Sequence, residues 1–322
     1  MGMATSANVV REGNIFDRFR GGNKGRRHFR LNLAAMLVIP YVIAVTLFSF
    51  GPFLVALVFS FSGFSAGKPE LFQAGFKNYI AVFSDPQFRE AYWNVIRFSV
   101  MATISGFIGS VGIALVLSLT RDRVGTIARS IFFLPGSING AALALIFIFM
   151  LEPTVSPFGF ILRALGWEKI SDYVKSSNAI LLMTVLRFYL TTGGWIAIFY
   201  SALESVPTEL VEAAKIDGCG PWQLSWHIRR PVIMGFVWFM VIQLIAQNMM
   251  IFGEPYIINT ALGGTSFISP YWSPNMLGSF YTLRLGNFGM SAVVALSQVL
   301  ITISSSIFIV TKTGAFTTQL TD

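Results

Sequence analysis

Side chains able to bind a ligand are sparse in the apolar segments of this chain. Gln243, Gln247 and Glu254 follow one another at helical spacing, within about 40° on a wheel of 100° per residue. Amide groups donate and accept hydrogen bonds, so this stripe could bind the hydroxyl groups of a sugar. Glutamines in apolar helices also join one helix to another. Both interpretations remain open at this point.

Aromatic and ionisable residues precede that stripe in another apolar segment. Trp195 and Tyr200 could stack on a sugar ring, or could be ordinary packing or interfacial aromatics. Arg187 could pair with an anionic ligand, form a salt bridge or snorkel toward the interface. With two histidines and one cysteine, Cys219, the chain offers neither a disulfide framework nor the ligands of a histidine or cysteine metal site. The converging ionisable groups of a membrane-embedded enzyme are not found in these segments.

The elements that carry these residues are long and apolar. Apolar and aromatic residues make up 54% of the chain, charged residues 12%, and the mean hydropathy is +0.66. Such a composition predicts an all-α membrane protein, since a helix crosses about 30 Å of hydrocarbon in roughly 20 residues. Six transmembrane helices are predicted at 31–62, 98–120, 130–151, 188–203, 231–253 and 285–311. The fourth becomes long enough when it extends back through Arg187 to about residue 178.

Basic residues predict the orientation. Seven lie in the first thirty residues, and Arg121, Arg123 and Arg129 follow the second apolar segment. The positive-inside rule therefore places both regions in the cytoplasm, together with the C-terminus and the loop at 204–230. We expect a basic tail at 1–30, one membrane domain at 31–312 and a tail at 313–322. Binding to nucleic acid is an alternative role for the basic tail. A signal peptide would also begin with basic residues, but the apolar run that follows is longer than the core of a signal peptide, so we expect an uncleaved first helix.

The loop at 204–230 is predicted to form two short helices. Pro207 and the acidic Glu209 and Glu212 favour a helix start, and Gly218 with the following Gly-Pro favours its end. One face of the first helix is formed by Leu210, Ala213, Ala214 and Asp217. The small alanines permit close approach to another surface. A second short helix is predicted from Pro221 to the start of the fifth span at Pro231. From these features alone, a plain connector between two spans is an equal possibility.

The loop at 204–230 resembles the coupling loop of permease subunits of binding-protein-dependent ABC importers, and we therefore call it the coupling loop. The resemblance rests on Glu212-Ala213-Ala214, Gly218, Ile228 and Pro231 at the family's spacing. The family usually has Leu before the proline, whereas this chain has Arg230. Weaker similarities to the sugar-uptake branch lie at 203–207, 252–256 and the pair Gly263-Gly264. Further back, Leu134-Pro135 and the pairs at 78–79 and 93–94 also resemble that branch, so the resemblance covers roughly residues 32–312.

The resemblance implies a multi-pass subunit of a bacterial-type inner membrane, surrounded by lipid. It implies that Glu212, Ala213, Ala214, Asp217, Gly218, Ile228 and Pro231 contact a cytoplasmic ABC ATPase dimer, which binds ATP and Mg. This chain itself would carry no cofactor and no catalytic residue, and we find no phosphate-binding loop motif in it. A second homologous permease and an external substrate-binding protein would complete the assembly, with no role for nucleic acid.

The implied cargo is a mono-, di- or oligosaccharide. Glycerol phosphate or another small polar solute is the alternative, and Gln243, Gln247, Glu254, Trp195 and Tyr200 are the candidate path residues. A self-sufficient channel or secondary transporter would also explain six spans, but it would leave the coupling loop without a use.

Overall fold

All regular structure in the described part of the chain is helical, as predicted. The computed structural model describes residues 36–63, 72–120, 122–138, 140–263 and 267–313. The predicted basic tail lies outside these residues, as do Arg121, Gly264 and nearly all of the predicted C-terminal tail. The cytoplasmic location of both termini therefore stays a prediction.

The chain divides into two units, Met1–Val55 and Ala56–Asp322, and each is described by itself. From Met36 the chain is helical through the π-helical η2 (Thr46–Phe50) and α2 (Gly51–Ser60), which together form a candidate span of 25 residues. The helices that follow are α3 (Lys77–Ser84), α4 (Pro86–Leu117), α5 (Asp122–Gly136), α6 (Gly140–Leu151), α7 (Gly159–Ala164), α8 (Ile170–Tyr173), η3 (Ser176–Asn178), α9 (Ala179–Glu204), α10 (Thr208–Ile216), α11 (Pro221–Leu224), η4 (Ser225–Arg229), α12 (Arg230–Met249), α13 (Gly253–Ala261), α14 (Pro274–Leu283) and α15 (Phe288–Thr313).

The third predicted span is not one straight helix. In its place α5 and α6 meet at a bend of 99°, so the described residues contain five single-helix candidate spans and one bent pair. Pro135 lies in the last turn of α5, where it removes a backbone donor and crowds the preceding turn. Hydropathy alone could not register this break, because the residues on both sides are equally apolar.

The second span begins at Pro86 rather than at residue 98. The side chain of Asp85 accepts a hydrogen bond from the N–H of Gln87 at 2.8 Å, and Pro86 occupies the first turn, so together they start the helix before the apolar run. The segment between the first two spans contains the short helix α3. Asn78 of α3 ties it to the preceding chain by donating to the carbonyls of Ser60 and Ser62 at 2.9 Å.

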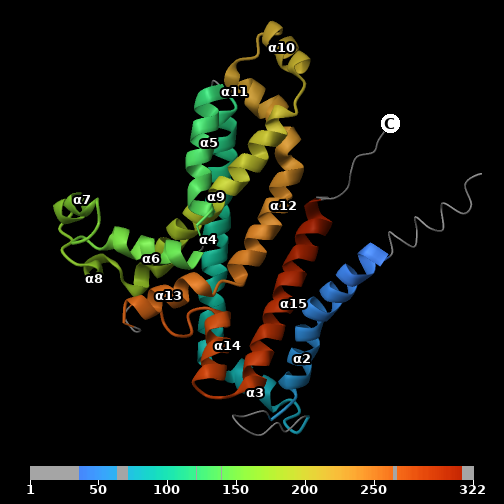
Figure 1. Ribbon diagram of the computed structural model, residues 1–322, viewed down its shortest axis with the longest axis vertical. Helices are drawn as coiled ribbons and strands as arrows, with labels where there is room; N and C mark the ends of the chain where they lie inside the picture. The colour runs from blue at the N-terminus through green and yellow to red at the C-terminus, as the bar shows by residue number, and fades with distance from the viewer. Residues whose placement is uncertain (1–35, 64–71, 121, 139, 264–266, 314–322) are drawn as a thin grey trace, which may run out of the picture. The chain divides into compact units, whose positions relative to one another are not determined.

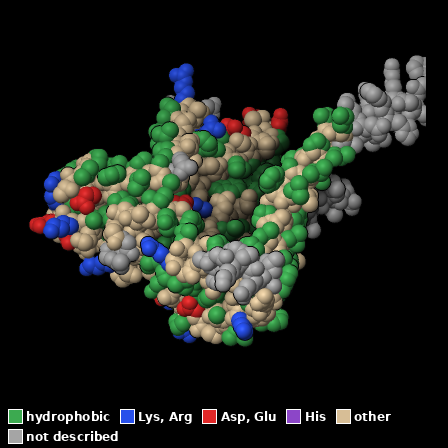
Figure 2. Space-filling view, turned by 60° about the horizontal axis from the view of Figure 1, so that its bottom comes forward, with side chains coloured by type: hydrophobic (Ala, Val, Ile, Leu, Met, Phe, Trp, Pro, Cys, Tyr) green, Lys and Arg blue, Asp and Glu red, His purple; other side chains and the backbone are tan. Residues whose placement is uncertain are grey.

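Within the larger unit, α9 packs against α4, α5 and α12, and α12 also packs against α15. One buried cluster includes Phe98, Met183 and Leu186, and another joins Phe199 to Met240. Figure 1 shows α10 and α11 together at one end of this unit and α3 and α14 at the other. Figure 2 shows hydrophobic side chains over much of the face on view, while charged side chains gather mainly at its left, upper and lower edges. This surface suits helices that contact lipid or other apolar helices.

Candidate functional site: a polar cluster and the coupling loop

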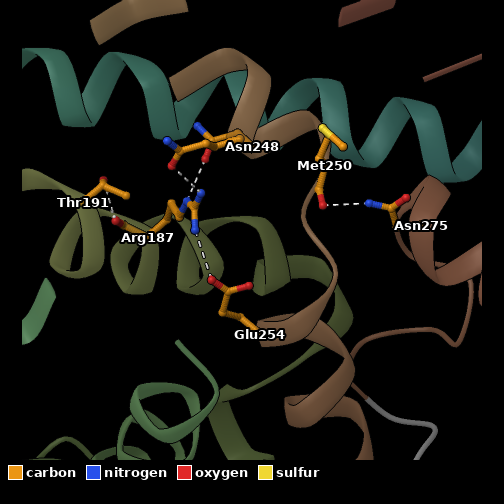
Figure 3. Close-up of polar contacts among 7 residues, drawn as sticks. Arg187, Thr191, Asn248, Met250, Glu254 and Asn275 are labelled. Carbon is orange, nitrogen blue, oxygen red and sulfur yellow. Dashed lines mark hydrogen bonds and ion pairs between the residues drawn. The ribbon is translucent and has the colours of Figure 1, made fainter. Parts of the chain in front are cut away.

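Arg187 of α9 is the centre of a polar cluster formed with Gln247, Asn248 and Glu254. Its Nε donates to Oδ1 of Asn248 at 2.9 Å, and its Nη1 lies 3.0 Å from Oε1 of Glu254. Its Nη2 donates to Oε1 of Gln247 at 3.3 Å. Figure 3 shows the guanidinium between Asn248 on one side and Glu254 on the other. One side chain therefore links three helices, α9, α12 and α13.

The ion pair in this cluster is largely shielded. The side chains of Arg187 and Glu254 are each 14% exposed, and no other ion pair is found among the described residues. Asn248 is fully buried, and its Nδ2 donates to Oγ1 of Thr103 on α4 at 3.4 Å. A Cβ placed on Gly140 would lie 3.2 Å from Oε1 of Glu254, so the start of α6 backs the carboxylate. A shielded ion pair needs these added hydrogen bonds, because its desolvation is costly.

Glu254 does not lie on the fifth span, contrary to the predicted helical stripe. The helix α12 ends at Met249, and Glu254 belongs to the first turn of α13. Two side chains, one from α14 and one from the residue before it, hold the chain where it turns. Ser273 donates to the carbonyl of Ile251 at 2.9 Å. Asn275 donates to the carbonyl of Met250 at 2.7 Å, as Figure 3 shows. Gln247 and Glu254 nevertheless meet at Arg187, through tertiary contacts rather than through helical spacing.

The other predicted path residues lie apart from this cluster. Gln243 is half-buried on α12, one turn before Gln247. Trp195 is half-buried and packs against Phe199 and Phe239, with ring centroids 6.1 and 6.0 Å away. Tyr200 is buried near the end of α9, where the guanidinium of Arg129 lies 3.7 Å from the centre of its ring. The arrangement therefore places Tyr200 beside the coupling loop, and its role in stacking on a sugar stays a prediction.

Two members of the polar network, Asn248 and Thr103, were not predicted from the sequence. Asn248 and Thr103 carry no special spacing, and each lies in an apolar helix where a single polar residue is unremarkable. The available signal was Arg187 itself, because an arginine inside a span needs acceptors. Asn248 adjoins the candidate path residue Gln247 in sequence, so its position was a second signal that it could accept a hydrogen bond from Arg187.

The first helix of the coupling loop, α10, begins after Pro207 and ends in a motif that requires glycine. Gly218 has a φ of +85°, and its N–H donates to the carbonyl of Lys215 at 3.1 Å. The N–H of Cys219 donates to the carbonyl of Ala214 at 2.9 Å. These two bonds form a Schellman motif, in which the residue after the helix adopts a left-handed conformation. The predicted helix end at Gly218 is confirmed.

The predicted single face of α10 is divided in the structure. Ala214 is 7% exposed and turns inward, whereas Leu210, Ala213 and Asp217 are exposed. Adjacent residues on a helix point about 100° apart, so Ala213 and Ala214 cannot both face the same partner fully. Glu212 and Gly218 are also exposed, which leaves most of the predicted contact residues accessible.

The second half of the coupling loop continues directly into the fifth span. Helical structure runs without a break from Pro221 to Met249 through the π-helical η4, so Pro231 does not begin the span as predicted. A π-turn shifts the hydrogen-bond register near Pro231, whose nitrogen cannot donate. Ile228 is half-buried and Pro231 exposed.

Arg230, the departure from the family pattern, stacks on the aromatic side chains of this segment. Its guanidinium carbon lies 4.3 Å from the centre of the Trp226 ring, which stacks in turn on Trp222 at 6.0 Å. Both tryptophans are exposed. An arginine over an indole ring gains a cation–π interaction, so Arg230 has a packing role that leucine could not supply.

Arg229 anchors the coupling loop to the end of α4. Its Nη1 donates to the carbonyl of Ser118 at 2.8 Å and contacts Oγ of the same residue at 3.0 Å. A cavity beside it is lined by residues at the ends of α4 and α9 and by residues of α10, including Glu212 and Lys215. The loop is therefore bonded to the end of α4, the helix that carries Thr103. It also follows directly after α9, the helix that carries Arg187.

Sequence comparison identifies relatives along most of the chain. The family described as binding-protein-dependent transport system inner membrane component matches residues 110–311. The probable ABC transporter permease protein YurN of Bacillus subtilis (strain 168) is 28% identical over 84% of this chain and 94% of its own length. The osmoprotective compounds uptake permease protein GgtC of Synechocystis is 25% identical over 83% and 93%. The sn-glycerol-3-phosphate transport system permease protein UgpA of Escherichia coli O157:H7 is 27% identical over 65% and 70%.

Solved structures share the fold. A chain of a bacterial alginate ABC transporter, in complex with an alginate pentasaccharide-bound periplasmic protein, superimposes with a TM-score of 0.74 and 16% identity. The match covers 88% of this chain and 94% of that one. A second structure of a bacterial ABC transporter involved in alginate import gives a TM-score of 0.73 at 16% identity, over 91% and 99% of the two chains.

Proposed function

Since this chain belongs to the family of inner membrane components of binding-protein-dependent transport systems, we propose that it forms half of a path for an uncharged carbohydrate. The chain is a multi-pass permease subunit of an ABC importer. The carbohydrate cargo is supported by the amide and carboxylate groups gathered around Arg187, which suit hydroxyl groups better than an apolar solute.

The hydrogen bonds of Arg187 and its ion pair with Glu254 favour a neutral cargo over an anionic one. A path for an organic phosphate would need a cation with donors available to the ligand. Arg187 is in direct contact with the candidate path residues Gln247 and Glu254, and it already donates to both of them and to Asn248. Its charge is neutralised by Glu254 at 3.0 Å. Glycerol phosphate, the cargo named for one relative, is therefore the less favoured candidate.

The coupling loop is the proposed contact with a separate ATPase. The residues that would make it are Glu212, Ala213, Ala214, Asp217, Gly218, Ile228 and Pro231. Support comes from the exposure of most of them at one end of the larger unit, and from the bond of Arg229 to α4. Closure of an ATPase dimer on ATP would shift the equilibrium between inward-open and outward-open states by binding one of them more tightly.

A second permease, an ATPase dimer and an external binding protein are the proposed partners. One chain of this kind supplies half of a path, and its apolar helix surfaces suit a similar chain as well as lipid. ATP and Mg would be bound by the ATPase, so this chain would need no cofactor of its own.

Copurification tests the proposal directly. The tagged chain is expressed with its neighbouring genes, purified in detergent and assayed for ATP hydrolysis with a binding protein and maltose, trehalose, sucrose or raffinose. Recovery of an ATPase and a second permease, with hydrolysis stimulated by a loaded binding protein, is the expected result. A chain recovered alone that conducts solute without ATP would contradict the proposal and favour a channel or secondary transporter.

A further inference from the structure

The guanidinium of Arg187 is surrounded by oxygen acceptors from three residues. Oδ1 of Asn248 accepts from Nε, Oε1 of Glu254 from Nη1 and Oε1 of Gln247 from Nη2. An arginine has five N–H donors in a fixed planar fork and no acceptor. Each amide in contact with it must therefore turn its oxygen toward Arg187 and its nitrogen away.

The two amides differ in where their nitrogens then point. Asn248 is fully buried, and its nitrogen donates to Thr103. Gln247 is exposed, and its Nε2 has no hydrogen-bond partner among the described residues. Only Gln247 is thus left with N–H donors available to a ligand.

Glu254 is fixed in a similar way. Its Oε1 faces Arg187 and lies close to the start of α6 at Gly140, while its Oε2 accepts no hydrogen bond from the described residues. In Figure 3 the second oxygen of this carboxylate carries no dashed contact. A carboxylate oxygen is an acceptor only, so Arg187 leaves one acceptor here and N–H donors on Gln247 nearby.

We infer that Arg187 is a positioning residue that orients Gln247 and Glu254 to bind hydroxyl groups of the cargo without contacting the cargo itself. A hydroxyl both donates and accepts, so one hydroxyl can donate to Oε2 of Glu254 while its neighbour accepts from Nε2 of Gln247. The pattern fits a polyhydroxyl ligand without charge. This inference rests on the proposed carbohydrate cargo.

Two variants separate positioning from mere structural support. Arg187→Lys keeps the charge and the pair with Glu254, but one ammonium nitrogen cannot hold three acceptors in the geometry of a fork. The exchange of Arg187→Glu combined with Glu254→Arg keeps an ion pair, yet the new carboxylate on α9 accepts from the amide nitrogen of Gln247. The amide then turns its oxygen toward the path and the donor pattern is inverted.

The measurement uses the whole complex in proteoliposomes with saturating binding protein and the best of the four neutral sugars. Both variants should assemble and unfold within a few degrees of the wild type. The number of sugars moved per ATP hydrolysed should fall at least fivefold in each. Arg163→Lys, on the exposed surface of α7, is the matched control and should change neither quantity.

The outcomes distinguish this inference from the proposed function. Wild-type sugar transport per ATP in both variants would overturn the positioning role, because only the ion pair would then matter. Loss of transport in the exchange variant alone would also overturn it, since Arg187→Lys must disturb the amides as well. A wild-type complex that moves none of the neutral sugars would overturn the carbohydrate proposal, and that failure is visible before any variant is made.

Discussion

Arg187 and Glu254 form an ion pair of 3.0 Å although 67 residues separate them in sequence. Arg187 lies in the first half of α9, and Glu254 lies in the first turn of α13. The pair thus joins the helix that leads to the coupling loop with the segment that follows the fifth span. Its surroundings make it sensitive to the loss of either partner.

Glu254→Gln should destabilise the protein by about 3–5 kcal/mol, because it leaves the charge of Arg187 shielded and unpaired. Thermal unfolding of the purified complex measures the effect. Replacing both partners by Met should recover much of the loss, since a well-packed apolar pair often equals a buried ion pair. The control Glu209→Gln changes an exposed residue of α10 and should leave the melting temperature unchanged. A Glu254→Gln protein as stable as the wild type would show that the pair contributes nothing.

Gln243→Leu together with Gln247→Leu should reduce sugar transport about tenfold, as expected from the loss of hydrogen bonds worth roughly 1.4 kcal/mol in total. Assembly with the ATPase and the second permease should remain intact. Uptake and copurification are measured side by side, with Val241→Leu as a control for added bulk on the same helix. If the complex falls apart, the two glutamines act as contacts between helices instead.

Gly218→Trp should abolish coupled uptake, because a bulky residue with a φ of +85° strains the Schellman motif that ends α10. ATP hydrolysis should continue without stimulation by loaded binding protein. Gly166→Trp is a matched control, since Gly166 has a φ of +81° with open space around it but follows α7, far along the chain from the coupling loop. Equal loss of uptake in the two variants would mean that the effect reflects general damage.

Glu212→Lys should likewise uncouple hydrolysis from uptake without unfolding the spans. Glu212 is exposed on α10 and belongs to the cavity beside Arg229, so a reversed charge alters the surface offered to an ATPase more than the apolar core. Transport per ATP is the quantity to compare, with Glu209→Lys as the neighbouring charge reversal outside the motif. Normal uptake in Glu212→Lys would contradict the assignment of the coupling loop.

Tyr173→Phe should flatten the loss of stability at alkaline pH. Burial first, and then the charges of Glu152 and Asp172, raise the pKa of Tyr173 from 10.0 to about 12. The folded state therefore holds this proton more tightly, and the contribution is complete below about pH 10 and lost as the pH rises through about 12. Unfolding scans between about pH 8 and about pH 12 test the sign.

At neutral pH the same variant should be neutral or slightly more stable. The hydroxyl of Tyr173 is buried with no hydrogen-bond partner among the described residues, so its removal spares a desolvation cost of about 1 kcal/mol. The stacking of its ring on Trp167 at 4.5 Å would be kept by Phe. A clear drop in stability at neutral pH would show that the hydroxyl has a partner in the assembled complex.

The sequence determined the class of the protein and the position of its coupling loop. In lipid, a long uncharged apolar segment must hydrogen-bond its own backbone N–H and C=O groups, and a helix does this within one segment. The apolar runs were therefore enough to predict an all-α membrane fold. The end of α10 could also be predicted from the local sequence. Glycine is the residue that adopts a left-handed conformation at little cost, and Gly218 does so where the sequence predicted the helix end.

Only the tertiary structure decided how the polar residues meet. Helical spacing predicted that Gln247 and Glu254 lie on one face of a single helix. In the structure α12 ends at Met249, and the chain then turns where Ser273 and Asn275 hydrogen-bond to its carbonyls. The two residues meet only because both contact Arg187. The role of Arg187 depended on acceptors supplied by distant segments, and Tyr200 lies against Arg129 rather than in the polar cluster. Periodicity reports which side of one helix a residue occupies, whereas hydrogen bonds and ion pairs depend on how several helices pack in space.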